Sequence, residues 1–363
     1  MEGRLRSVPS RGDLPALKLP ANGLERMIDS LRWARLRLTL RAEEALRLPP
    51  YAGSTFRGAF GHAFKRVACP LRGACESCLH RTVCVYAYVF ETAGSSDGSL
   101  LARGATVSHP FVLEPPESAP AELTAGDPIE LGLVLIGRAI PLAPYFLAAC
   151  RDMASLGLGR GRGRCRLTRV VAEDPDSPAG RVVYDGVADL LAPAVPVWSM
   201  AELNRLRNAG EPIAKSAMGR GMRNNGTRGG EEQVTLEFVT PTRLRQEADL
   251  VVRPEFATLA TALLRRLSVL AEVHCGARAE IPAREVLAAA AAVKIAESKL
   301  RWHDWERYSA RQGTRMALGG FVGRITFAGD LGPWLPLLRL GEVLHVGKGT
   351  AFGLGKYRIV EGP

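Results

Sequence analysis

The sequence has no long apolar segment. No run reaches the roughly 18 to 20 apolar residues that a helix needs to cross a bilayer, and residues 1–23 carry arginine, lysine and proline instead of the apolar stretch of a signal peptide. The pattern argues against a membrane protein, and we expect a cytoplasmic one.

Common nucleotide-site and hydrolase motifs are missing as well. In the glycine-rich stretch 347–356, Lys356 is followed by Tyr357 rather than by serine or threonine, and the dinucleotide spacing of glycines fails. There is no HExxH pair, no serine-histidine-acid order and no paired acidic metal motif. The missing motifs do not exclude ribonuclease activity, because RNA supplies its own 2′-OH nucleophile. Its cleavage needs only a general base and a cation near phosphorus.

Acidic residues are in short supply. The 363 residues include 48 Lys and Arg against 37 Asp and Glu, which gives a net charge of +11. This excess favours a polyanionic partner. With 47% hydrophobic residues, the chain is long enough for about two domains with cores of their own.

Seven cysteines are present, an odd number that argues against a disulfide framework. Four of them follow the spacing C-x5-C-x2-C-x5-C, namely Cys69, Cys75, Cys78 and Cys84. Four thiolates surround one tetrahedral zinc ion and leave no open position for chemistry, so the spacing predicts a structural zinc and no catalytic metal. Two alternatives stay open: His80 replaces one cysteine as ligand, or the thiols are free.

Periodicity predicts an alternation of strands and helices. Strands are expected at 35–41, 129–136, 234–239, 300–308, 321–327 and 357–360, and helices at 54–67, 144–155, 254–273 and 334–340. Each half ends with a helix, a glycine-rich basic loop and a strand, which predicts an internal duplication of a βαββαβ unit.

The predicted duplication also predicts where the domains begin and end. Residues 1–30 are expected to form an irregular arm, residues 31–205 a first domain with a cysteine insertion at 68–90, and residues 233–363 a second domain. The stretch 206–232 is rich in glycine, arginine and asparagine and predicts a linker.

Two glycine loops occupy equivalent places in the two halves, at 157–166 and 347–356. Each offers backbone N–H groups and cations, which suit a phosphodiester backbone. The expected RNA contacts include Arg160, Arg162 and Arg164 in the first loop, and His345 at the start of the second. The alternative is that both loops are plain turns.

The predicted helix 54–67 has an apolar face and an opposite polar one. Phe56, Phe60 and Ala63 share the first, while His62 falls on the second. Gly58 and Gly61 each cost about 1 kcal/mol relative to alanine in a helix interior, so a close approach to that backbone is expected. A solvated histidine without a role is the alternative.

The stretch LRWHDWERY, residues 300–308, interleaves aromatic residues with cations. Such a strand suits base stacking and phosphate binding, so Arg301 and Arg307 are further expected RNA contacts. Aromatic residues in a strand also commonly belong to a core, and that alternative stays open.

Several stretches together resemble the CRISPR repeat-processing endoribonucleases of the sixth Cas family, within the RAMP superfamily. They span roughly residues 35–360 and include YAGSTFRGAFGHAFKR, HPFVLEPP, GLGRGRGR, FVTPTRLR and GKGTAFGLGKY. The resemblance implies an α+β fold of two tandem ferredoxin-like (RRM-like) domains. It also implies metal-independent cleavage of precursor CRISPR RNA within its repeats, leaving a 5′-hydroxyl and a cyclic phosphate.

The resemblance also suggests site residues and partners. It places the general base near the first helix of the first domain, where His62 lies, with Lys65, Arg57 and Tyr51 near it in sequence. The family's RNA-binding loop matches Gly347, Lys348, Gly349, Gly353, Gly355 and Lys356. The implied partners are repeat RNA, at a hairpin or its flank, and other Cas subunits of an effector complex.

Two other functions are compatible with these patterns. One is a non-catalytic RAMP subunit that binds and caps guide RNA in an effector complex. The other is a zinc-stabilised DNA-binding protein, which would bind duplex DNA at least as well as repeat RNA.

Overall fold

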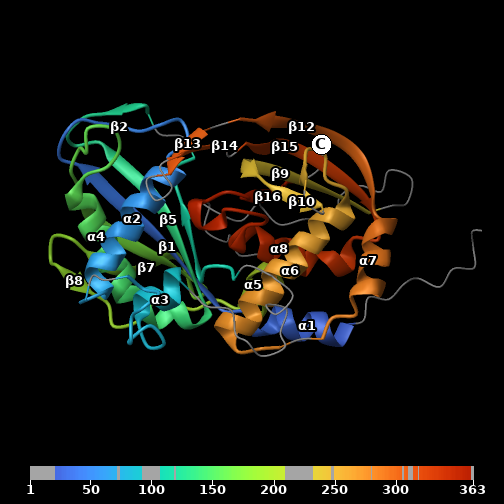
Figure 1. The fold of residues 1–363 in the computed structure, drawn as a ribbon. Coiled ribbons are helices and arrows are strands. Elements are labelled where there is room, and N and C mark those ends of the chain that lie inside the picture. Colours follow the sequence, from blue (N-terminus) through green and yellow to red (C-terminus); the bar gives the residue numbers. More distant parts are fainter. Residues whose placement is uncertain are drawn as a thin grey trace, which may run out of the picture.

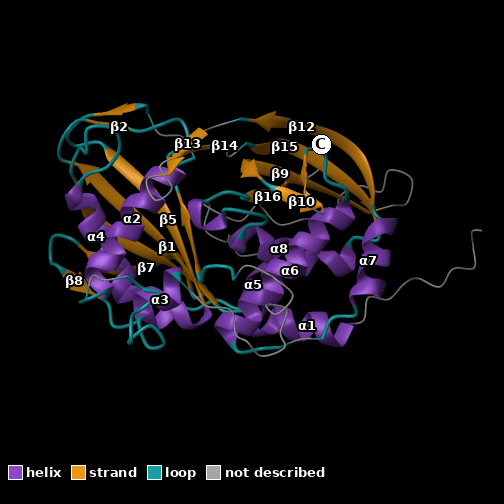
Figure 2. Cartoon of the chain, viewed as in Figure 1, coloured by secondary structure: helices purple, strands orange, loops and turns teal. Residues whose placement is uncertain are grey.

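The computed structural model describes residues 21–71, 74–91, 107–117, 120–208, 232–246, 249–278, 280–304, 306–309, 314–317 and 319–360. These residues form two main antiparallel sheets with helices packed beside them, one sheet in each half of the chain (Figure 1). The expected α+β class is confirmed, and Figure 2 shows the helices and strands by colour.

The first sheet has the strand order β3-β5-β1-β6-β7-β8. Leucines alternate along β1 and are buried, as the period of a half-buried strand requires. Helices α2 and α4 pack against each other beside this sheet (Figure 2). The element bounds are α1 Ala21–Ser30, β1 Trp33–Ala42, β2 Leu46–Arg47, α2 Gly53–Ala68, α3 Val85–Phe90, β3 Phe111–Glu114, β4 Glu122–Leu123, β5 Pro128–Ile136, η2 Gly137–Leu142, α4 Ala143–Leu156, β6 Cys165–Asp174, β7 Ser177–Asp185 and β8 Leu190–Leu191.

The second sheet has the order β12-β15-β9-β16. It arches over α6 and α8, and the loop that connects α8 to β16 lies on the side of the first sheet, where η4 contacts β3 and α2 (Figure 1). The bounds here are α5 Met200–Asn208, β9 Glu232–Thr242, β10 Leu244–Gln246, β11 Asp249–Val251, α6 Phe256–Cys275, α7 Ala283–Ala292, β12 Lys294–His303, β13 Glu306–Ser309, β14 Thr314–Ala317, β15 Gly320–Gly329, η3 Gly332–Trp334, α8 Leu335–Leu344, η4 Thr350–Phe352 and β16 Tyr357–Val360.

Three sequence predictions about elements need correction. The irregular arm proposed for residues 1–30 does not extend to residue 30, because residues 21–30 form α1; residues 1–20 lie outside the described part. The single strand at 300–308 is divided, since β12 ends at His303 and β13 begins at Glu306. Of the linker 206–232, residues 206–208 close α5 and residue 232 opens β9, and the rest lies outside the described residues.

Each half of the chain contributes residues to the hydrophobic core of the other half. Helix α1 places Leu24, Met27 and Ile28 in the core of the second half, at the i, i+3, i+4 spacing of one helical face. In the opposite direction, Ala351 of the C-terminal loop joins the first core. This exchange ties the two halves together.

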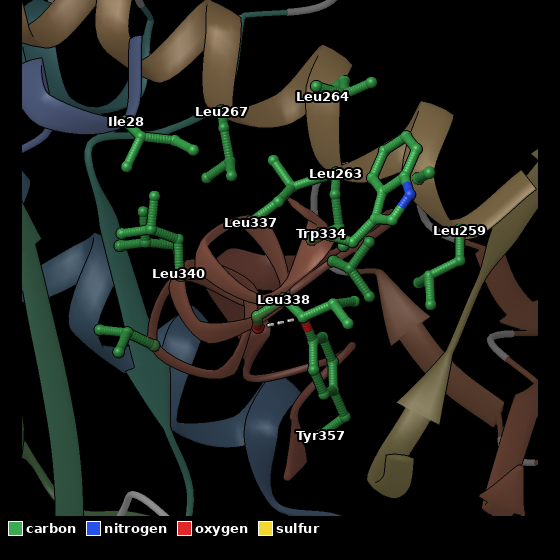
Figure 3. Packing of buried hydrophobic residues seen from close by; sticks show 14 of the residues in the cluster. Ile28, Leu259, Leu263, Leu264, Leu267, Trp334, Leu337, Leu338, Leu340 and Tyr357 are labelled. Carbon is green, nitrogen blue, oxygen red and sulfur yellow. Dashed lines mark hydrogen bonds between the residues drawn. The ribbon is translucent and has the colours of Figure 1, made fainter. Parts of the chain in front are cut away.

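The second core is built where α6 crosses α8 (Figure 3). Leucines of both helices interlock there, and Ile28 of α1 closes one side of the cluster. Tyr357 reaches in from β16, and its hydroxyl donates to the Leu338 carbonyl at 2.6 Å. That bond satisfies a polar group that would otherwise be costly to bury.

Among the helices of the described residues, none is long and apolar enough to span a bilayer.

Candidate functional site

Helix α2 presents three phenylalanines to the first core and a polar face to solvent. Phe56, Phe60 and Phe64 are fully buried, and the ring of Phe60 packs with rings of α3, α4 and β3. The prediction that His62 faces away from the core is confirmed, because it is exposed. The helix begins at Gly53, one residue before the predicted start at residue 54, with Ala52 as its N-cap and without a side-chain cap.

Near His62, one stretch of the exposed face of α2 is not covered by other described side chains. A Cβ added at Gly58 would meet no described atom within 4 Å, so the backbone there is open. Lys65 lies one turn beyond His62 on the same side, and its Nζ is 5.4 Å from the centre of the Tyr86 ring. His62 therefore has a cation one turn away and an open stretch of helix one turn before it.

Of the six histidines, His62 and His80 are exposed and His303 is partly exposed. His274 and His345 are fully buried, and His109 is largely enclosed. Burial lowers the pKa of His109 and of His274 to about 4, so both rings are neutral at pH 7. The two nitrogens of His274 are already engaged, by Tyr88 Oη at 3.0 Å and the Ser108 carbonyl at 2.8 Å.

Arg57 and Tyr51, predicted beside His62, serve the contact with the C-terminal loop instead. The Arg57 guanidinium lies 4.6 Å from the Phe90 ring centre and 5.3 Å from that of Phe352. Tyr51 Oη donates to the Phe352 carbonyl at 2.7 Å. Burial, with the charge of Glu114, raises the pKa of Tyr51, which makes it a poor general base.

The C-terminal glycine loop is folded on itself. Gly347, Gly349, Gly353 and Gly355 all have positive φ, between 75° and 83°. A Cβ at Gly355 would collide with the Val346 carbonyl. The glycines thus permit the turns of the loop, and the backbone N–H groups of Val346, Lys348, Phe352, Gly353 and Gly355 bond to carbonyls within the chain.

The structure corrects the assignment of His345 and Lys356 as surface contacts for RNA. Both are buried and bind Glu114 of β3: His345 Nε2 lies 2.9 Å, and Lys356 Nζ 3.4 Å, from its Oε1. Arg35 contacts the other oxygen at 2.8 Å. Burial opposes ionisation of Glu114, but Arg35, Lys356 and the His345 hydrogen bond outweigh it and hold its pKa well below 4.5. These side chains fasten the loop to the first half.

Lys348 is the exposed cation of this loop, and it has neighbours that sequence reasoning missed. Its backbone N–H donates to the Arg243 carbonyl at 3.0 Å. Partial burial and the charges of Arg245, Arg243 and Arg265 lower the pKa of Lys348. We call Lys348, Arg243, Arg245 and Arg265 the cation cluster. The side chains of the cluster form no ion pair with any described acidic residue, and such unneutralised charge suits polyanion binding.

The signal for the cation cluster was present in the sequence as TRLR, residues 242–245. The sequence could not show that these arginines lie near Arg265 and Lys348, because Arg265 belongs to α6 and Lys348 lies about 100 residues further along the chain. Arg243 Nε is buried without a hydrogen-bond acceptor in the structure, so this corner holds an unsatisfied donor.

The Gly/Arg loop of the first half lies against the segment that leads into α2. Arg160, Arg162 and Arg164 are exposed, as expected. Arg164 is neutralised by Glu44, with its Nε 2.8 Å from Oε1. The Arg160 backbone N–H donates to the Arg47 carbonyl at 3.1 Å.

Both glycine loops therefore touch the short stretch before α2. The first loop contacts Arg47, and the C-terminal loop contacts Tyr51 and packs against Gly53. Arg47 and Tyr51 are four residues apart, so at most about 14 Å of extended chain separates the two contacts.

The aromatic stretch 300–308 is described only in part. Arg301 is exposed on β12, while the side chain of Arg307 lies outside the described residues. Trp302 is partly buried against the second core, and its Nε1 donates to Asp304 Oδ1 at 2.6 Å. Trp302 thus follows the core alternative.

The four clustered cysteines occupy the connection between α2 and α3. Cys69 is the C-cap of α2, and Cys84 is the N-cap of α3. Over the described residues, no set of three or more His, Cys, Asp and Glu side chains is already arranged to hold a metal ion. The zinc ion predicted from the spacing remains a prediction.

Residues 236–357 match the sequence model of the CRISPR-associated endoribonuclease Cas6. This part of the chain is therefore a Cas6 endoribonuclease domain. Residues 31–195 match a second family model, described as an N-terminal domain. An uncharacterized protein of Archaeoglobus fulgidus is 24% identical over 333 residues, covering 91% of this chain and 98% of that protein.

Solved structures of Cas6 proteins share the fold. The product complex of a Thermus thermophilus Cas6 is 19% identical, with a TM-score of 0.50, and the match covers 90% of this chain and 98% of that one. A chain of a partial Cas6-RT-Cas1–Cas2 complex has a TM-score of 0.54 at 12% identity, covering 91% of this chain and 46% of its own.

Proposed function

We propose that this Cas6-family protein cleaves precursor CRISPR RNA within its repeats without a catalytic metal. The 2′-OH of one nucleotide attacks the adjacent phosphorus, the bond to the 5′-oxygen breaks, and a 2′,3′-cyclic phosphate and a 5′-hydroxyl remain. His62 takes the 2′-OH proton, and Lys65 stabilises the charge that develops on the phosphate oxygens. The leaving 5′-oxygen receives a proton from His62 or from water.

One observation carries the assignment of the base. His62 is an exposed histidine on α2, and the two buried histidines His274 and His345 are bonded within the protein. The open backbone at Gly58 leaves room for an RNA strand to lie against the His62 face. The match of residues 236–357 to the endoribonuclease family supports the reaction class.

We also propose that both halves are ferredoxin-like units. Each has the element order strand-helix-strand-strand-helix-strand around an antiparallel sheet, with the first strand paired to the third and the fourth. The glycine loops of both units contact the stretch before α2, at Arg47 and Tyr51. This arrangement supports a single RNA-binding path that runs along both units. The structural likeness to a chain of a Cas6-RT-Cas1–Cas2 complex supports a role beside other Cas proteins.

The reaction is tested with end-labelled repeat RNA from the same genome, incubated with purified protein in EDTA. A single cut is expected, leaving a cyclic phosphate and a 5′-hydroxyl. A copy with one 2′-deoxy substitution at the cut site is expected to bind and resist cleavage, because the nucleophile is gone. Cleavage of the deoxy copy would contradict the mechanism, and tight binding without cleavage of ordinary repeat RNA would favour the guide-binding subunit.

The cation cluster is expected to hold RNA phosphate. Lys348→Ala and Arg245→Ala should each weaken repeat RNA binding and lower the slope of log K against log salt by about 0.7 to 0.9 for each phosphate that is no longer bound. Arg324→Ala is a matched control, because Arg324 Nε is already paired with Glu237 at 2.9 Å. Equal slopes for Lys348→Ala, Arg324→Ala and wild type would show that the cluster does not bind RNA.

A further inference from the structure

The connection between α2 and α3 encloses a small hollow that the proposed chemistry does not use. Its walls include all four clustered cysteines, and its volume of about 10 Å³ has room for one water-sized sphere. The other lining residues are Leu71, Ala74, Arg81 and Ala87.

We propose that Cys69, Cys75, Cys78 and Cys84 bind one structural zinc ion in this hollow. The outer two ligands are anchored by helices: the Cys69 backbone N–H donates to the Lys65 carbonyl at 2.9 Å, and the Cys84 carbonyl accepts from Tyr88 at 2.9 Å. The inner two are joined by a turn, in which the Cys78 N–H bonds to the Cys75 carbonyl at 3.3 Å.

The hollow distinguishes between the two ligand sets that the spacing allows. All four cysteines line it, whereas His80 is exposed and does not. Every cysteine of the set is a free thiol in the structure. Four thiolates carry two more negative charges than one zinc ion neutralises, and Arg81 in the wall of the hollow offsets part of that excess.

The described residues of this connection also form no apolar core that would order it. Leu71, Leu79 and Val83 are 61%, 96% and 79% exposed, so hydrophobic burial contributes little there. The four sulfurs are not yet in metal-binding geometry, and metal binding would close the loop as it does in small zinc domains, where ligation and folding are coupled.

Zinc at this position would join the end of α2 to the start of α3. Helix α3 supplies Phe90, whose ring packs at 5.3 Å from that of Phe64 and under the Arg57 guanidinium. The ion thus supports the helix that carries His62. With four protein ligands it has no open position, so it takes no part in cleavage.

The test measures metal content of the full-length protein by elemental analysis. Wild type is expected to hold one zinc ion per chain, and cobalt added to zinc-free protein should give the visible absorption of a tetrahedral thiolate site. Cys75→Ser and Cys78→Ser are expected to lose both signals. Cys275→Ser and His80→Ala, which change groups outside the hollow, should keep them.

Two results would overturn the proposal. One is wild-type protein that binds neither zinc nor cobalt while its four thiols remain reduced and reactive. The other is full zinc content in Cys75→Ser and Cys78→Ser. The cobalt spectrum of zinc-free wild type keeps the test decisive if the serine variants do not fold.

Discussion

Replacing His62 with alanine is expected to lower the single-turnover rate of repeat cleavage by about 10² to 10⁴ while leaving RNA affinity nearly unchanged. General base catalysis contributes a factor of this size, and the loss falls on the chemical step because His62 is on the helix surface and supports no core packing. The measurement is the cleavage rate at saturating protein, with affinity determined separately on the 2′-deoxy RNA.

Two control variants test whether the loss of cleavage is specific to His62. His80→Ala removes another exposed histidine and is expected to cleave at the wild-type rate. Tyr51→Phe removes the hydroxyl that donates to the Phe352 carbonyl, and this variant too should still cleave. If His62→Ala kept the wild-type rate, the base would lie elsewhere, with the partly exposed His303 the next histidine to replace.

Replacing Glu114 with alanine is expected to lower the free energy of unfolding by about 3 to 5 kcal/mol, because it breaks a buried ion-pair network. Arg35 would keep only the more distant Glu173, at 3.7 Å, and Lys356 would keep only Glu117. Arg35 and Lys356 are 5% and 6% exposed, and neither can move its charge into water without unfolding the contact between the two halves. Urea unfolding followed by tryptophan fluorescence measures the change.

Glu122→Ala is the matched control for this carboxylate. Glu122 also pairs with an arginine, at 2.9 Å from Arg47, but its side chain is 68% exposed, and exposed pairs contribute little. Its replacement should hardly change stability. Equal losses for Glu114→Ala and Glu122→Ala would show that the buried network does not hold the halves together.

The depressed pKa of Glu114 also predicts the sign of a pH effect. A carboxylate whose pKa is lower in the folded than in the unfolded protein stabilises the fold above its ordinary pKa of 4.5, and this contribution is lost as pH falls through the folded value. Unfolding free energy of the wild type should therefore decline below about pH 4.5. Glu114→Gln should show a shallower decline, since glutamine does not titrate.

Much of the fold could be predicted from local pattern. The alternating leucines of β1 and the phenylalanine face of α2 are periodic over their own lengths, and helix or strand periodicity is sufficient to place such elements. The same pattern placed His62 on the exposed face. Helix α1 was missed, although Leu24, Met27 and Ile28 have helical spacing, because its apolar face packs against residues more than two hundred positions away.

The sequence alone therefore determined the alternating strand β1, the exposed face of α2 and the spacing of the four cysteines, because each depends on residues close together along the chain. Only the tertiary structure decided which charges are available to RNA. Lys348 and Lys356 occupy the same loop, yet Lys348 is exposed and its pKa is lowered by nearby arginine charges, while Lys356 is buried against Glu114 and Glu117. Their difference arises from partners on distant segments, and the energy of a charge depends on the groups and the water that surround it.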